Sequence, residues 1–187
     1  MRKSRAVLQL KVSSLSPSAS RGMLTVGSFR FACALGRSGQ RALKREGDGA
    51  TPPGKFELQR VFYRADRVTR PTTRLPVRAL RSNDGWCDAA GDRNYNRHVV
   101  HPYPASAERM WREDDLYDVV VVISHNQRPR IRGLGSAVFI HIAREGFTPT
   151  EGCIALRRAD LLRLLGLLRP GDRIVVGRAQ AKKNPAE

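Results

Sequence analysis

The sequence predicts a single, mainly-β domain with one helix near its C-terminal end and a long irregular insertion in its middle. Several short apolar segments have the alternation or the β-branched runs of strands, whereas only one segment has the leucine density of a helix. Residues 64–110 carry few strand signals and indicate the insertion. A chain of 187 residues suits one domain that buries a core without disulfides. We expect this domain to span residues 7–177.

The first expected strands lie in the N-terminal part of the chain. Residues 7–12 alternate between apolar and polar side chains, which is typical of a strand. Residues 23–35 predict a hairpin that turns at residues 27–28 and places Cys33 on the buried face, as a small core residue. A further strand is expected at residues 56–63.

The second half of the chain carries the helix. Leucines recur after residue 158, and a Pro-Gly pair follows them, which predicts a helix that ends there. The aromatic and asparagine residues of the insertion predict that it is ordered and shapes a groove. The remaining expected elements are strands at residues 116–123, 137–142 and 173–176, the helix at residues 158–168, and a disordered basic tail at residues 178–187.

The net charge of +17 allows three interpretations. A nucleic-acid-binding module, a solvated basic surface and attraction to an acidic substrate or polymer all fit it. The sequence has no recognition-helix or RNP-type motif, so no nucleic acid partner is expected. The basic start is followed by too short an apolar run for an export signal. No run reaches the roughly 18–20 residues of a membrane helix. We therefore expect no membrane span, and a cytoplasmic location stays open.

The three cysteines do not form a disulfide framework, because their number is odd and small. No Cys-x-x-Cys pair is present, so we expect no structural zinc and no other metal. Cys87, beside Trp86 and Asp88, has no base near it in the sequence and is interpreted as structural. Cys153 is different, because a candidate base precedes it.

His141 and Cys153 form the candidate catalytic pair. His141 lies at the end of an expected strand, and Cys153 follows in the segment Thr150-Glu151-Gly152-Cys153. We expect Cys153 to lie in the turn before the helix, where backbone N–H groups stabilise a thiolate and His141 accepts the thiol proton. The N–H groups around Gly152 would then stabilise an oxyanion. From the spacing alone, a buried thiol and a satisfied core histidine remain the alternative.

Two motifs of the sequence resemble motifs in the catalytic domain of the YkuD-type L,D-transpeptidases, and they follow one another in the same order as in that family. One is the strand leading to His141 with the following Thr150-x-Gly152-Cys153, and the other is Asp48-Gly-Ala-Thr-Pro-Pro-Gly-Lys-Phe56. The resemblance extends over about residues 7–176. It implies a β-sandwich or barrel and no cofactor.

The resemblance also implies roles for the residues of the motif around His141 and Cys153. Cys153 would be the nucleophile, His141 the base, and Thr150 and Gly152 the loop around the oxyanion, while the backbone carbonyl of Ile142 would orient His141. The implied substrates are peptidoglycan tetrapeptide stems, cleaved between diaminopimelate and D-Ala through an acyl-enzyme. The implied location is the cell envelope.

One position departs from the family pattern. Many members carry an arginine two places after the cysteine, and this chain has Ala155. Arg144 is the expected substitute for binding the substrate, with Arg97 and Arg132 as alternatives, and Asn126 and Trp86 are further candidates for shaping the pocket. The acceptor stays open, because an amine would make the enzyme a transpeptidase and water an L,D-carboxypeptidase. The oligomeric state also stays open.

Overall fold

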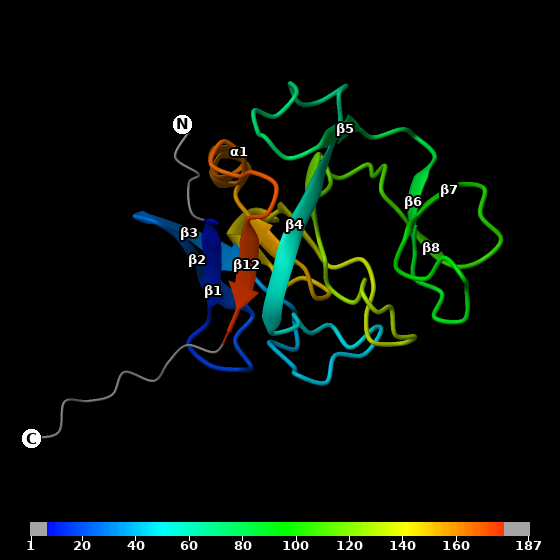
Figure 1. Ribbon diagram of the computed structural model, residues 1–187, viewed down its shortest axis with the longest axis horizontal. Coiled ribbons are helices and arrows are strands. Elements are labelled where there is room, and N and C mark those ends of the chain that lie inside the picture. The colour runs from blue at the N-terminus through cyan, green and yellow to red at the C-terminus, as the bar shows by residue number, and fades with distance from the viewer. Residues whose placement is uncertain (1–6, 178–187) are drawn as a thin grey trace, which may run out of the picture.

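The computed structural model describes residues 7–177, so the expected basic tail at residues 178–187 lies outside the described residues (Figure 1). Most strands belong to one nine-stranded sheet in the order β12-β1-β2-β3-β11-β10-β9-β4-β5. β12 also pairs with β4, so the sheet curls round and closes on itself. The strands of this barrel are β1 (Gln9–Ser13), β2 (Arg21–Val26), β3 (Phe29–Ala34), β4 (Gly54–Tyr63), β5 (Val77–Ala79), β9 (Val119–Ile123), β10 (Phe139–Ile142), β11 (Ile154–Leu156) and β12 (Arg173–Val176).

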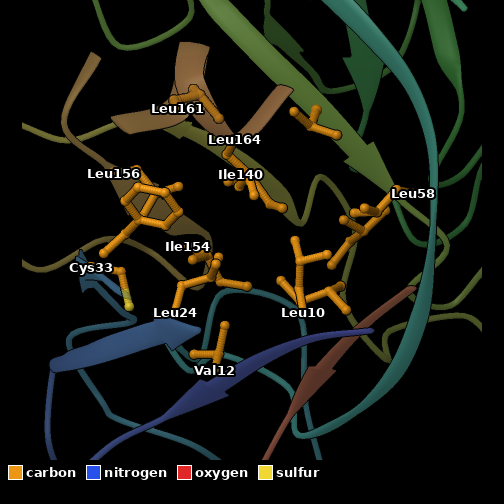
Figure 2. Close-up of a cluster of buried hydrophobic side chains, with 14 of the residues drawn as sticks. Leu10, Val12, Leu24, Cys33, Leu58, Ile140, Ile154, Leu156, Leu161 and Leu164 are labelled. Atoms are coloured by element: carbon orange, nitrogen blue, oxygen red, sulfur yellow. The ribbon is translucent and has the colours of Figure 1, made fainter. Parts of the chain in front are cut away.

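The main core fills the barrel and is closed at one end by the helix. Alternate residues of the strands point inward, as the period of two requires, and Figure 2 shows Leu10, Leu24, Ile140 and Ile154 converging there. The helix α1 (Arg158–Leu165) adds three fully buried leucines to this core, Leu161, Leu164 and Leu165. The inward-facing side chains of the sheet thus form the hydrophobic core, so a functional site on these strands would lie on their outward face.

The insertion covers part of the outward face of β9, β10 and β11. It contains a three-stranded sheet in the order β7-β6-β8, formed by β7 (His98–Val100), β6 (Asp84–Cys87) and β8 (Ala107–Arg109), which lies beside the barrel (Figure 1). Its Trp86 and Met110 pack with Phe139 and Val122 of the barrel in a second apolar cluster. Because both faces of these strands are covered, every residue of β9, β10 and β11 is buried.

The fold class expected from the sequence is confirmed, and so is the hairpin that turns at residues 27–28. Cys33 is confirmed as a core residue, with 1% of its surface exposed. The insertion, expected to be irregular, contains the four short strands β5, β6, β7 and β8. Each spans three or four residues, which is too short to show an alternation in the sequence.

Several element boundaries differ from the expected ones, and three of them have a clear local reason. The strand expected from residue 116 begins at Val119, because the preceding buried residues lie in a turn. The strand expected from residue 137 begins at Phe139, because Ala137 has a φ of 50°. The helix ends at Leu165 rather than at residue 168, since Gly166 caps it and the following residues form a turn. None of the described helices is long and apolar enough to cross a membrane.

Candidate active site

A cavity of about 310 Å³ lies against the outward face of β10 and β11, and Cys153 and His141 both line it. The parallel register pairs His141 with Ala155, so these two side chains point to the same side of the sheet. Cys153 lies two residues before Ala155 and therefore faces the same way. The two strands thus bring the candidate nucleophile and the candidate base into one cavity.

The Cys153 thiol is buried and held by the backbone at the start of β10. Its Sγ accepts a hydrogen bond from the Phe139 N–H at 3.3 Å and donates one to the Ala137 carbonyl at 3.2 Å. Burial, and then the charge of Glu108, raise the pKa of Cys153 to about 12, against the effect of the Phe139 N–H. The thiol is therefore neutral at pH 7.

The expectation that Cys153 lies in the turn before the helix was wrong. Cys153 comes directly before β11, and α1 begins only at Arg158. The backbone N–H that reaches the sulfur is that of Phe139, on the neighbouring strand. The apolar run after Cys153 forms a short strand because it completes the sheet between β3 and β10.

His141 is buried and its ring is oriented by its own strand. Nδ1 lies 2.8 Å from the carbonyl oxygen of Ile142, and this acceptor holds a proton on Nδ1 and leaves Nε2 as the free acceptor of the neutral ring. The ring of Tyr117 packs edge-on at 5.3 Å. Burial lowers the pKa of His141 to about 4, although the Ile142 carbonyl opposes the shift. The resting pair therefore consists of a neutral thiol and a neutral imidazole that line one cavity.

The loop before Cys153 is held together by Thr150. Its hydroxyl donates to the Cys153 carbonyl at 2.7 Å and accepts from the Gly152 N–H at 3.2 Å. Gly152 has a φ of +133°, and a Cβ there would lie 2.8 Å from the carbonyl oxygen of Ala50. The Gly152 N–H is thus already engaged, whereas the Cys153 N–H makes no hydrogen bond among the described residues.

The second sequence motif forms the back of this loop. Thr51 is fully buried, and its hydroxyl accepts from the Gly36 N–H at 2.8 Å and lies 3.5 Å from the Cys153 carbonyl oxygen. Gly36 also forms an isolated bridge with Thr150. The two motifs that the sequence analysis singled out therefore lie against each other.

The structure brings only some of the other candidate residues to the cavity. Arg144 lines it, and its guanidinium lies 3.5 Å from Asp114. The Asn126 side chain instead holds its own loop through the carbonyls of Ile131 and Gly135. Trp86 packs edge-on against Phe139 in the second apolar cluster and donates to Asn96. Neither of these two residues lines the cavity, and neither do Arg97, Arg132 and the buried Cys87.

Sequence reasoning missed four residues that line the cavity from the insertion side, namely Asp88, Glu108, Arg112 and Tyr117. No spacing relates them to Cys153, and none of them belongs to either of the two motifs that carry the resemblance. Among the described residues, no group of three or more histidine, cysteine or carboxylate side chains has the arrangement of a metal site.

A family model described as the YkuD L,D-transpeptidase catalytic domain matches residues 21–176. No curated protein matches the chain. L,D-transpeptidase 3 from Mycobacterium tuberculosis is 15% identical, with a TM-score of 0.44 over 91% of this chain and 61% of that protein. An L,D-transpeptidase from Mycobacterium smegmatis is 12% identical, with a TM-score of 0.41 over 91% of this chain and 59% of that one. The chain spans about three-fifths of the length of these proteins.

Proposed function

The chain belongs to the YkuD family of L,D-transpeptidase catalytic domains, and on that premise we propose that it acts on peptidoglycan tetrapeptide stems through an acyl-enzyme on Cys153. One observation carries the proposal: Cys153 and His141 share a face of the sheet and line the same cavity. This arrangement supplies a nucleophile and a base at one place, as covalent acyl transfer requires.

In the proposed first step, Nε2 of His141 accepts the thiol proton while the sulfur attacks the carbonyl between diaminopimelate and D-Ala. The Cys153 N–H, which has no partner among the described residues, would donate to the resulting oxyanion. The imidazolium then returns the proton to the amine of D-Ala as the C–N bond breaks. The product is a thioester of Cys153 and free D-Ala.

In the second step an amine of another stem attacks the thioester carbonyl and gives up a proton to His141. Cys153 leaves as the thiolate and takes that proton, which restores the neutral pair. Attack by water on the same thioester would release a tripeptide stem instead. The acceptor therefore decides between cross-linking in the cell wall and L,D-carboxypeptidase activity. Both reactions use the same residues in the first step.

The experiment is incubation with purified disaccharide-tetrapeptide and mass spectrometry of the products. We expect D-Ala with dimer, and the Cys153→Ala variant should release no D-Ala. Cys33→Ala is the matched control, because Cys33 is equally buried but lies in the barrel core, away from the cavity. Release of D-Ala by Cys153→Ala would refute the proposal. Tripeptide without dimer would assign the carboxypeptidase reaction and leave Cys153 as the nucleophile.

A further inference from the structure

Besides Glu151, which is exposed and paired with Arg37 at 2.9 Å, three carboxyl groups line the cavity of a chain that carries a net charge of +17. They belong to Glu46, Asp88 and Glu108, which come from different segments of the chain. Burial raises the pKa of Glu108 against the effects of the Tyr117 hydrogen bond and the Arg112 charge, and the charges of Asp88 and Glu46 add to the rise. The charge of Glu108 also acts on Cys153, which places it near the reacting sulfur.

The basic side chains of the cavity are already paired with carboxylates that do not line it. Lys44 forms an ion pair with Asp48 and donates to the Arg45 carbonyl at 2.7 Å. Arg112 binds Asp114 through two hydrogen bonds of 2.7 Å, and Arg144 adds a longer contact to the same carboxylate. Among the described residues, the three carboxyl groups therefore receive only one contact from these basic side chains, that of Arg112 with Glu108 at 3.9 Å.

Several oxygen atoms of the cavity lining have no partner among the described residues. Glu108 accepts one hydrogen bond, from the Tyr117 hydroxyl at 2.7 Å, and Arg112 reaches it only at 3.9 Å. Oδ1 of Asp88 and Oγ of Ser136 are buried and have no hydrogen-bond partner, and Ser136 is 8% exposed. Buried polar atoms without partners are costly, so this lining is suited to a ligand with several N–H donors.

We propose that Glu108, Asp88 and Ser136 form a subsite that binds a primary ammonium group on the side chain of the residue whose carbonyl Cys153 attacks. An ammonium group offers three donors and one positive charge, which matches two carboxylates and a hydroxyl. A cavity of about 310 Å³ admits one such side chain rather than a whole stem. This inference rests on the proposed function, and it makes the donor stem's diamino acid the feature that is recognised.

The test compares two tetrapeptide stems that differ only in this amine, one with lysine and one with norleucine at the third position. The rate of acyl-enzyme formation is followed by intact mass, without any acceptor. We expect a kcat/KM about 10- to 100-fold higher for the lysine stem, the range of a charge-assisted hydrogen bond. Glu108→Gln and Asp88→Asn should each reduce that ratio several-fold.

The ratio of the kcat/KM values for the lysine and norleucine stems separates recognition of the amine from reactivity of Cys153. If Glu108 acted only by changing the reactivity of Cys153, Glu108→Gln would change the rates for both stems by the same factor and would overturn the subsite. Glu57→Gln is the control, because it removes the same charge from the exposed face of β4, which does not line the cavity. We expect it to leave the ratio unchanged.

Failure of the subsite and failure of the proposed function give different results. Equal acylation by both stems would overturn the subsite and leave the function standing. If neither stem acylates Cys153, the function fails, and binding of both stems to Cys153→Ala by calorimetry then decides the subsite. Tighter binding of the lysine stem would support it, and equal or absent binding would overturn it.

Discussion

The neutral thiol of Cys153 leads to a prediction about the free enzyme. Burial raises the pKa of Cys153 to about 12, so about one thiol in 10⁵ is ionised at pH 7, compared with roughly one in 30 for an ordinary cysteine. Only the thiolate is alkylated. Without substrate, iodoacetamide should therefore modify Cys153 about 10³-fold more slowly than it modifies an exposed cysteine at pH 7.

The pH dependence of this alkylation tests the state of the pair. Burial lowers the pKa of His141 to about 4, so only about a tenth of the imidazole is charged at pH 5, and about a hundredth at pH 6, to stabilise a thiolate. We expect the rate, followed by peptide mass spectrometry between pH 5 and 10, to rise about tenfold per pH unit without a plateau. His141→Ala should leave this slope unchanged and abolish D-Ala release.

A different profile would refute this reasoning. A fast alkylation with a plateau near neutral pH, lost in His141→Ala, would show a thiolate–imidazolium pair in the free enzyme. The Cys33 thiol serves as the internal reference, because burial also raises its pKa to about 12. Slow modification of both cysteines at pH 7 would agree with the prediction.

Three further predictions concern stability and the loop. His141 is protonated below about pH 6.5 in the unfolded chain but only below about pH 4 in the folded chain. Lowering the pH through this window should therefore reduce the free energy of unfolding by about 3 kcal/mol, as measured by urea unfolding. The His141→Gln variant should not show this loss. Gly152→Ala should lose about 1–3 kcal/mol of stability and most activity, because the φ of Gly152 is +133° and the added Cβ would meet the Ala50 carbonyl. The control is Gly91→Ala, which has open space around the added Cβ and should change neither stability nor activity. Thr150→Val should lower the melting temperature and kcat by removing two hydrogen bonds of the loop, and Thr150→Ser should retain both; a normal kcat in Thr150→Val would contradict this role.

The local patterns of the sequence predicted much of the barrel. The hairpin of β2 and β3 and the leucine-rich helix α1 follow from alternation and periodicity within a few residues. The starts of β9 and β10 did not follow, because Leu116 and Ala137 are apolar but Leu116 lies in a turn and Ala137 has a φ of 50°. The short strands of the insertion depend on pairing with one another rather than on their own composition.

The sequence by itself indicated the candidate pair Cys153 and His141 and the Thr51 element behind them, because each belongs to a short motif of residues close together in the sequence. Only the tertiary structure decided the chemistry of the cavity. The neutral state of the thiol and the gathering of Glu108 with Asp88 depend on burial and on charges brought together from distant parts of the chain. Desolvation and Coulomb interactions act through space, so no spacing along the sequence reports them.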